Sequence, residues 1–572
     1  AASRAAPKGW RRRALRHRAK AAAAGGGGGQ PRYPYSLARA KARLSPMLGR
    51  TVEQMQALDP RCCPGGQAVA VVTMHPQFIA KSRYPQHLFK RYGLRPVGSM
   101  PLEVEPERYS NQKLSGPMPT HAWLLAGGRD AFARWASEIN GLGDEIPRTA
   151  AVGRDLRTLE EIHVHQVEER LGEMPAPSDS AVPMELVVHA SGRDDQLLTA
   201  LTEWLRAQDV SGEDFNPRSA KRFFLRGLTF WRVRANKAQA ERIAQFSFVR
   251  ALRVLASIRP LPAPVIRSAD ETVELPQHPA LNPQATVAVF DGGLPPDHGL
   301  ERWVQLYEPV NPVKIGAPVA EYTMHGMGVT SALLFGHVPD DNVLPQPFCR
   351  VSHHRVLGDA NRDIDLFEVV DEIRLVMTAR HYEFVSLSVG PPKPIDDGNP
   401  SLWTALIDEL LEEGGTLMGI AVGNDGHRPE PRIQVPADAA NALAVGATAC
   451  RTELWSRAIY SCVGPGRAPA GIKPDVVAFG GSARHPFVTV GPGGVLMTTR
   501  GTSLSTPSVI RLGTGVQAVL GDALSTEAIR ALILTSAHQN GHPANEVGWG
   551  RVPETVDDLV TCPDGVVRVV DP

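Results

Sequence analysis

Four short segments between residues 286 and 507 constrain this chain most, because each joins an apolar run to a polar side chain at a turn. Residues 286–293 read TVAVFDGG, the pattern of a buried parallel strand that feeds a tight turn. Residues 325–334 read HGMGVTSALL, a histidine at the start of an apolar helix, and residues 420–426 read IAVGNDG, another strand that ends in a turn. Residues 501–507 read GTSLSTP, which predicts a serine at the start of a helix.

Each segment alone has an ordinary structural explanation. Asp291 is typical of a turn after a strand, and Ser503 is typical of a helix cap. The order Asp, His, Ser along one chain, each in a fitting local context, is what favours a catalytic site. Three other histidines compete with His325 for the role of a base: His298, His353 and His354. None of them precedes a Gly-led apolar helix, so these three are predicted to be surface or loop residues.

Taken in order, the four segments resemble the motifs of the subtilases, the subtilisin-like serine peptidases. The resemblance covers about residues 283–560 and implies a mostly parallel, doubly wound α/β sheet with helices on both faces. It also implies that Asp291, His325 and Ser503 form a catalytic triad and that Asn424 supplies an amide to the oxyanion hole.

The chemistry of peptide hydrolysis requires these residue types. A serine hydroxyl is a weak nucleophile until a neighbouring base takes its proton. His325 can do this near neutral pH and can later protonate the leaving amine. Asp291 would fix the tautomer of His325, while Asn424 and the Ser503 N–H would meet the oxyanion. The expected reaction is acyl transfer from a peptide bond to Ser503, followed by hydrolysis.

The chain departs from the family pattern beside two of these residues. Met327 and Gly328 stand where the family usually has a threonine and a second histidine, and Leu504 and Ser505 replace methionine and alanine. None of the four is a triad member, so activity is expected to survive. The Ser505 hydroxyl on a buried helix needs a partner, and a carbonyl one turn back is the candidate.

Residues 384–390, FVSLSVG, resemble the strand whose edge pairs with a bound peptide. Substrate is therefore expected to add there as an extended strand, with main-chain hydrogen bonds and little sequence demand. The pocket for the residue before the cut is expected between two uncharged walls, made of Ser388, Val389, Gly390, Ala421, Val422 and Gly423. These walls favour an apolar or medium-sized side chain, with Gln434 at the base of the pocket.

Residues 183–260 show strand and helix patterns in the order β-α-β-β-α-β. The strand patterns cover 185–189, 222–226, 229–234 and 249–255, and the helix patterns cover 197–205 and 236–244. This order predicts a ferredoxin-like α+β module, the fold that subtilase propeptides have directly before the catalytic domain. The resemblance implies that residues 255–258 approach Ser503, so that the module is a built-in chaperone or inhibitor. An ordinary interaction module explains the pattern equally well.

Five segments are expected along the chain. They are a basic disordered tail at 1–35, an α/β module of unknown role at 36–175, the ferredoxin-like module at 183–260, a Pro-rich linker at 261–284 and the peptidase domain at 285–560. The module at 36–175 has strand patterns at 67–73 and 120–125, which make it a candidate for a degenerate copy of the ferredoxin-like module. A short basic helix is predicted at 37–44, with Pro46 ending it.

Composition narrows the compartment and the partners. No apolar run reaches 18 residues, so no membrane helix is expected, and six cysteines without regular spacing predict free thiols. The first acidic residue of the chain is Glu53. The only apolar run in the tail is four alanines, which is too short for a secretory signal. A cytoplasmic location is therefore expected. The tail is predicted to be a solvated arm rather than a nucleic-acid site.

These observations predict a cytoplasmic serine endopeptidase that acts on protein or peptide substrates and is restrained by its N-terminal half. The reaction requires no cofactor. Structural calcium stays open because members of the family often bind it, although no acidic cluster here identifies a site. Two alternatives remain: a latent protease that a regulatory protein partner activates in a stress or defence system, and a pseudoenzyme that binds peptides without cutting them.

Overall fold

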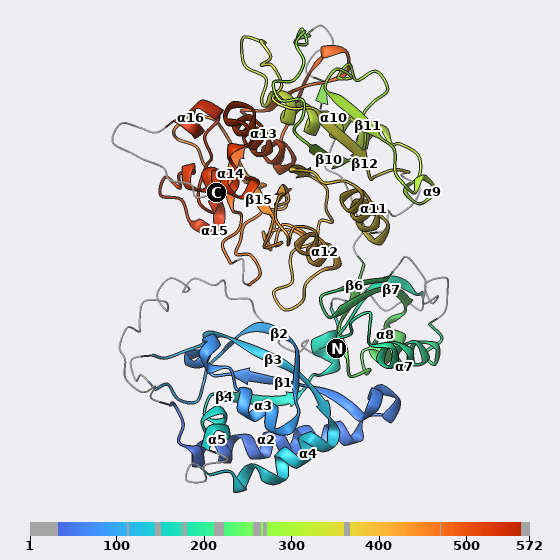
Figure 1. Ribbon diagram of the computed structural model, residues 1–572, viewed down its shortest axis with the longest axis vertical. Coiled ribbons are helices and arrows are strands. Elements are labelled where there is room, and N and C mark those ends of the chain that lie inside the picture. The colour runs from blue at the N-terminus through green and yellow to red at the C-terminus, as the bar shows by residue number, and fades with distance from the viewer. Residues whose placement is uncertain are drawn as a thin grey trace, which may run out of the picture.

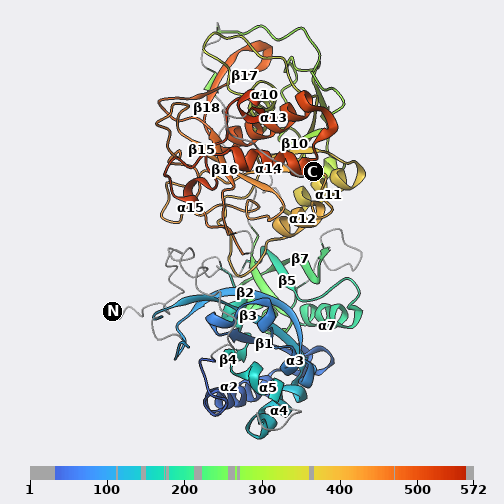
Figure 2. The same ribbon diagram turned by 60° about the vertical axis from the view of Figure 1, so that its left-hand side comes forward.

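The computed structural model describes residues 33–110, 114–143, 150–172, 174, 180–210, 222–255, 265–266, 271–359, 366–468 and 471–561. The molecule has two parts stacked along its longest axis, an N-terminal half (residues 33–255) and a C-terminal domain (residues 271–561), as Figures 1 and 2 show. Most of the predicted basic tail, and residues 261–264 and 267–270 of the predicted Pro-rich linker, lie outside the described residues.

The C-terminal domain is built on a seven-stranded sheet in the order β11-β12-β10-β13-β14-β15-β16, and every neighbouring pair is parallel. The strands are β10 (Val287–Asp291), β11 (Val304–Tyr307), β12 (Val351–Arg355), β13 (Phe384–Leu387), β14 (Leu417–Ala421), β15 (Leu443–Thr448) and β16 (Val476–Phe479). Every residue of β10, β13, β15 and β16 is buried, and β12 and β14 each have one partly buried residue, as expected for a parallel sheet that is covered on both faces.

Helices cover both faces of this sheet. One face is covered by α10 (Ala320–Phe335), α13 (Thr502–Leu520) and α14 (Thr526–Ser536), and the other by α11 (Leu366–Ala379) and α12 (Leu402–Leu410). On β10, Val287 and Val289 belong to the apolar cluster of the first three helices, whereas Ala288 and Phe290 belong to the cluster of α11 and α12. The predicted doubly wound α/β fold is therefore confirmed.

The remaining elements of the C-terminal domain lie around this core. A small sheet in the order β17-β18-β9 is formed by β9 (Val265–Ile266), β17 (Phe487–Val490) and β18 (Leu496–Thr499). The short helices are α9 (Pro312–Ile315), α15 (Ala544–Val547) and α16 (Val556–Val560).

The N-terminal half contains two modules with the same strand arrangement. The first module has α2 (Leu37–Ala57), β1 (Gln67–Met74), α3 (Gln86–Tyr92), β2 (Arg95–Val104), β3 (Met118–Gly128), α4 (Arg129–Glu138), α5 (Ala150–Leu156), β4 (Leu159–Val164) and α6 (Val167–Arg170). The second has β5 (Val182–Val188), α7 (Asp195–Arg206), β6 (Arg222–Leu225), β7 (Leu228–Ala235), α8 (Lys237–Ile243) and β8 (Val249–Val254).

Their sheets run β2-β3-β1-β4 and β6-β7-β5-β8, and all pairs are antiparallel. In each module the first and third strands therefore form the centre and the second and fourth strands form the edges. The β-α-β-β-α-β order expected of the second module is thus observed in both.

The sheet of the second module contacts two different cores through its two faces. On β5, Leu186 and Val188 belong to an apolar cluster that the two N-terminal modules share, whereas Val187, between them, belongs to the cluster of α11 and α12. This alternation follows from the two-residue period of a strand. Phe223 on β6 also faces the C-terminal domain, and its ring centroid lies 5.8 Å from that of Phe367 on α11. The second module is therefore packed between the first module and the C-terminal domain.

Helix α2 differs from the prediction. It was expected to end at Pro46, but it continues to Ala57 with Pro46 inside it. A proline in a helix interior costs about 3 kcal/mol relative to alanine. Burial of one helix face offsets this cost, because Leu44, Leu48 and Met55 are almost fully buried in the shared core of the N-terminal half.

Candidate active site

The predicted site residues gather at the carboxyl end of the parallel sheet. Asp291 is the last residue of β10, and β13 and β14, which lead to Ser388 and Asn424, lie next in the sheet. Helices α10 and α13 pack against each other and carry His325 and Ser503. Ligand sites of open α/β sheets lie at this edge, where loops follow the strands.

Asp291 and His325 form a buried hydrogen-bonded pair. His325 Nδ1 lies 2.8 Å from Asp291 Oδ1, and the two residues are 3% and 0% exposed. Asp291 Oδ1 also accepts the Gly292 N–H at 2.7 Å. Because a carboxylate accepts, Nδ1 of His325 carries a proton, and in the neutral imidazole Nε2 presents its lone pair. Within the described part of the chain, Nε2 has no hydrogen-bond partner. The pair therefore presents an available base.

Ser503 lies in the first turn of α13. Gly501 precedes this helix with φ of 155°, and Ser503 is fully buried. Its hydroxyl donates to the Ser388 carbonyl at 3.4 Å, a long contact that holds the hydroxyl weakly. Ser505, two positions further along the helix, donates to the Thr502 carbonyl at 3.1 Å, so the hydroxyl that replaces the usual alanine has a partner on its own helix.

Asn424 is oriented by the start of the same helix. Its Oδ1 accepts from the Thr502 backbone N–H at 2.9 Å and from the Thr502 hydroxyl at 3.2 Å. A backbone N–H can only donate, so the oxygen of the amide must face Thr502. The Asn424 NH₂ group is thereby left as a donor beside the turn that carries Ser503. This arrangement supplies the group that an oxyanion requires.

The expected substrate walls are closely packed. A Cβ on Gly390 would lie 2.7 Å from the Val435 carbonyl oxygen, and one on Gly423 would lie 2.2 Å from Gln434 Oε1. Gln434 is held in place because its Nε2 donates to Asp425 Oδ2 at 2.7 Å. The carboxamide of Gln434 therefore lies directly against Gly423, which is one of the residues of the predicted pocket walls.

His298 lies in a loop, as predicted, whereas His353 and His354 are neither surface nor loop residues, contrary to the prediction. All three are buried, and His353 and His354 lie on β12, beside the strand that ends in Asp291. Burial lowers the pKa of His353 and of His354 to about 4. His298 accepts the Leu300 N–H through Nδ1 at 2.9 Å. The absence of a following apolar helix does not indicate an exposed histidine, because His353 and His354 are buried on a strand instead.

Two kinds of feature are absent from the described part of the chain. Among the described residues, no group of three or more His, Cys, Asp or Glu side chains is placed to hold a metal ion. No helix within the described ranges combines the length and apolar character needed to span a membrane.

Comparisons with known proteins agree with this geometry. The model of the subtilase family matches residues 264–550, so the C-terminal domain is that of a subtilisin-like serine peptidase. The chain belongs to the subtilase family. No curated protein matches it in sequence.

Solved structures with a similar fold are also subtilisin-like proteases. The prenylagaramide maturation protease PagA is 22% identical over 49% of this chain and 94% of its own, with a TM-score of 0.38. Fervidolysin from Fervidobacterium pennivorans is 16% identical over 69% and 63%, with a TM-score of 0.46. The epidermin leader peptide processing protease EpiP from Staphylococcus aureus is 14% identical over 67% and 98%, with a TM-score of 0.44.

Proposed function

We propose that this subtilase is an endopeptidase whose nucleophile is Ser503. His325 takes the Ser503 proton through Nε2 and returns it to the leaving amine. Asp291 holds the His325 tautomer and stabilises the imidazolium, and the Asn424 amide meets the oxyanion together with the Ser503 N–H. Substrate adds along Ser388–Gly390 as an extended strand.

The observation that carries this proposal is the buried Asp291–His325 pair with its available Nε2. A surface pair of this kind would be weak evidence for catalysis, but here the Nε2 atom is buried and has no other partner among the residues that the structure describes. Active-site contacts are often long before substrate binds, so the 3.4 Å contact of Ser503 with Ser388 is compatible with a nucleophile that turns to His325 when substrate arrives.

The direct test compares the full chain with its Ser503→Ala variant. The native chain is expected to react covalently with a fluorophosphonate at Ser503 and to cleave casein, and the variant is expected to do neither while keeping its thermal midpoint. Loss of the triad serine costs about 10⁶-fold in rate in subtilisin, a member of the same family. Peptidase activity in the pure variant would refute the assignment. A native chain that binds peptide but neither labels nor cleaves would be the pseudoenzyme.

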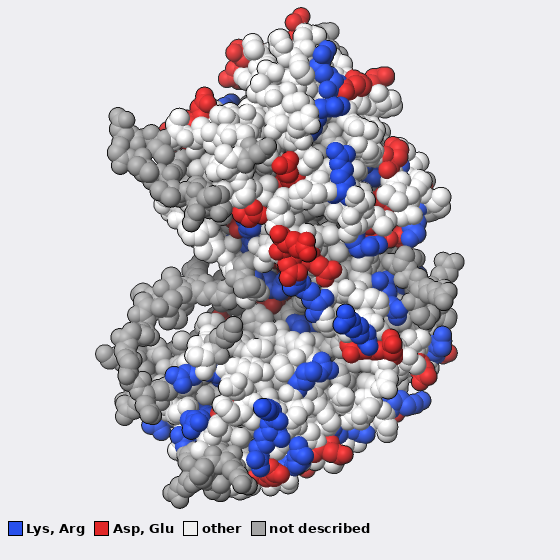
Figure 3. Space-filling view, in the orientation of Figure 1, with Lys and Arg blue, Asp and Glu red and all other residues white. Residues whose placement is uncertain are grey.

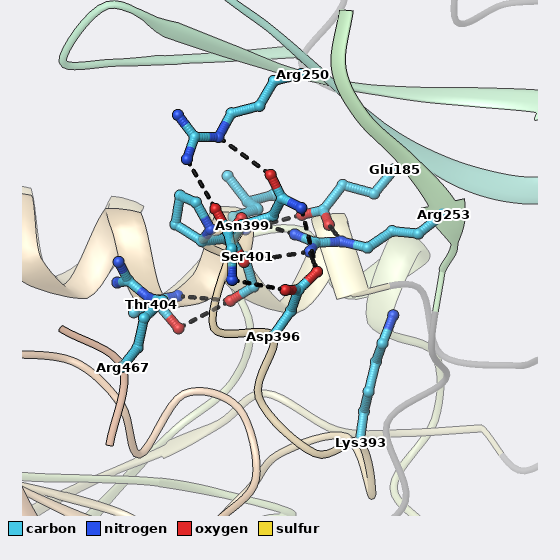
Figure 4. Close-up of polar contacts among 12 residues, drawn as sticks. Glu185, Arg250, Arg253, Lys393, Asp396, Asn399, Ser401, Thr404 and Arg467 are labelled. Atoms are coloured by element: carbon cyan, nitrogen blue, oxygen red, sulfur yellow. Dashed lines mark hydrogen bonds and ion pairs between the residues drawn. The ribbon is translucent and has the colours of Figure 1, made fainter. Parts of the chain in front are cut away.

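We further propose that the N-terminal half restrains the peptidase. Glu185 and Arg253 on neighbouring strands of the second module form a buried ion pair at 2.5 Å. Glu185 also accepts the Leu402 N–H at the start of α12, at 2.8 Å, where a helix end favours an anion. Arg253 donates to the Asn399 and Pro400 carbonyls. Figure 4 shows how these side chains reach the loop before α12.

The last strand of the second module ends near the predicted substrate walls. Leu255, which follows β8, lines a cavity of about 30 Å³ together with Pro391, Lys393 and Val435. Pro391 directly follows Gly390, and Val435 contacts it. Residues 256–258, which were expected to approach Ser503, lie outside the described residues. The position of Leu255 supports a restraint that acts at the substrate edge.

Charge also joins the two parts of the molecule. Arg226, at the turn between β6 and β7, pairs with Glu412 just after α12. On the face shown in Figure 3, acidic side chains of the C-terminal domain and basic side chains of the N-terminal half meet along this boundary. Both partners of the pair are more than half exposed, so salt will screen it, and it adds little to the apolar contacts.

The restraint can be tested in the full chain with two variants of one strand. Phe223 is 5% exposed and faces α11, whereas its neighbour Phe224 is 39% exposed. Phe223→Arg is expected to loosen the second module and raise casein cleavage, and Phe224→Arg is expected to leave it unchanged. Equal activity in both variants and the native chain, with the module shown by cross-linking to have separated, would refute the restraint. The assignment of Ser503 would still stand.

A further inference from the structure

His353 is a buried histidine beside the catalytic pair that the proposed mechanism does not use. It lies on β12 and is paired with Val289 of β10. Val289 precedes Asp291, the last residue of β10, by two positions. Both of its ring nitrogens have partners. Nε2 lies 3.2 Å from the Gly293 backbone nitrogen, and Nδ1 lies 2.9 Å from the Thr330 hydroxyl. Gly293 belongs to the turn that follows Asp291, and Thr330 belongs to α10, which carries His325.

These partners fix the protonation state of His353. The Gly293 N–H can only donate, so Nε2 of His353 must offer its lone pair. Its proton therefore sits on Nδ1 and is donated to the Thr330 hydroxyl. A second proton would turn Nε2 into a donor and set it against the N–H of Gly293. His353 can hold this turn only as a neutral imidazole.

The contacts around Gly293 show how closely His353 constrains the catalytic pair. Gly293 has a φ of 92°, in the left-handed region. A Cβ on Gly326, the residue after His325, would lie 2.1 Å from the Gly293 carbonyl oxygen and 3.0 Å from the His353 ring. The turn after Asp291, the start of α10 and the His353 ring therefore meet at one point. Movement of the turn would change the relation between Asp291 and His325.

We propose that His353 is a positioning residue of this peptidase, which holds the turn after Asp291 through the Gly293 N–H and so keeps Asp291 against His325. This inference rests on the proposed triad. It gives the buried histidine a role distinct from that of a base, because neither ring nitrogen is available to a substrate.

The electrostatic surroundings favour the neutral form that this role requires. Burial is the main cause that lowers the pKa of His353 to about 4, while the Asp291 carboxylate raises it and any positive charge on His298 or His325 lowers it. At neutral pH the lone pair on Nε2 is therefore present. As the pH falls toward 4, protonation of His353 removes the acceptor for Gly293, and activity is expected to be lost.

The test uses two full-chain variants that fill the same space but differ in their ability to accept a hydrogen bond. His353→Gln offers an oxygen to Gly293, whereas His353→Leu offers none. The Leu variant is expected to lower kcat about 10²-fold with little change in KM, the cost of a misplaced catalytic group, and the Gln variant is expected to recover most of this loss. His354→Gln is the matched control, because His354 is buried on the same strand but bonds to Tyr382.

A readout without turnover separates this proposal from the function itself. The proton shared between His325 Nδ1 and Asp291 is expected to give a low-field NMR signal in the native chain, in His353→Gln and in His354→Gln. In His353→Leu this signal is expected to be absent. A native-like signal and kcat in His353→Leu would overturn the proposal, as would equal losses in His354→Gln. If the native chain neither cleaves nor labels at Ser503, the proposed function fails, and the NMR comparison still decides the role of His353.

Discussion

Asn424 owes its orientation to Thr502, since both donors of that residue point at its side-chain oxygen. The NH₂ group therefore needs no reorganisation when the oxyanion forms, which is the condition under which such a donor contributes most. Asn424→Ala is expected to lower kcat by about 10²–10³ with little change in KM, a magnitude known from subtilisin in the same family. Steady-state kinetics on a peptide substrate would show it. A loss confined to KM would instead mark Asn424 as a substrate-binding residue.

Gln434 determines the space at the base of the predicted pocket. Its carboxamide lies against Gly423 and is fixed by Asp425, so a long side chain before the cut would have to displace it. Gln434→Gly is expected to broaden cleavage toward large apolar residues at that position, which profiling with a peptide library would detect. An unchanged profile would show that the pocket lies elsewhere. Gln434→Glu, which keeps the size but loses the donor to Asp425, is the matched comparison.

At the scale of elements, α2 carries an identifiable cost. Pro46 lacks the N–H of a helical residue, while Leu44 and Leu48 on either side of it are fully buried. Pro46→Ala is expected to stabilise the chain by about 1–3 kcal/mol, the helix gain less the entropy that alanine returns to the unfolded state. Urea unfolding of the two proteins would measure the difference. Ser45→Ala, one position earlier on the same helix, serves as the control and should change the midpoint little.

The elements also show what sequence reasoning can and cannot reach. The strand before Asp291 was predictable because a parallel strand buried on both faces is apolar throughout, and the β-α-β-β-α-β order of the second module was visible in its periodicity. The extension of α2 past Pro46 was not, since tertiary burial outweighs a local propensity. The pairing of Glu185 with Arg253 and the place of His353 behind Asp291 depend on which strands become neighbours, and no local pattern encodes that.

At the scale of the whole molecule, Arg250 joins the two N-terminal modules to the C-terminal domain. It donates to the Ser99 carbonyl of the first module and to the Gly398 carbonyl of the C-terminal domain, while its own strand belongs to the second module. His189 lies beside it, fully buried, and donates through Nδ1 to the Val97 carbonyl at 3.1 Å. Burial first, and then the charge of Arg250, hold the pKa of His189 well below its ordinary value.

This junction makes stability depend on pH. The folded chain keeps His189 neutral, whereas the unfolded chain protonates it near pH 6.5. The stabilisation is therefore fully present above pH 6.5 and is lost as the pH falls below it, by up to about 1.4 kcal/mol for each unit. Urea unfolding at pH 7.5 and pH 5.5 is expected to show the loss, and His189→Asn is expected to reduce it. An equal loss in the variant would place the titrating group elsewhere.

The order of the parts along the chain has a consequence for synthesis. The second module is complete at β8, whereas Ser503 lies about 250 residues further on. A ribosome adds about 5–20 residues each second, so roughly 10–50 s separate the two events. In both N-terminal modules all four strands of the sheet come from the module itself, so both modules can fold in that interval. If they restrain the peptidase as proposed, its nucleophile is never translated before its restraint exists.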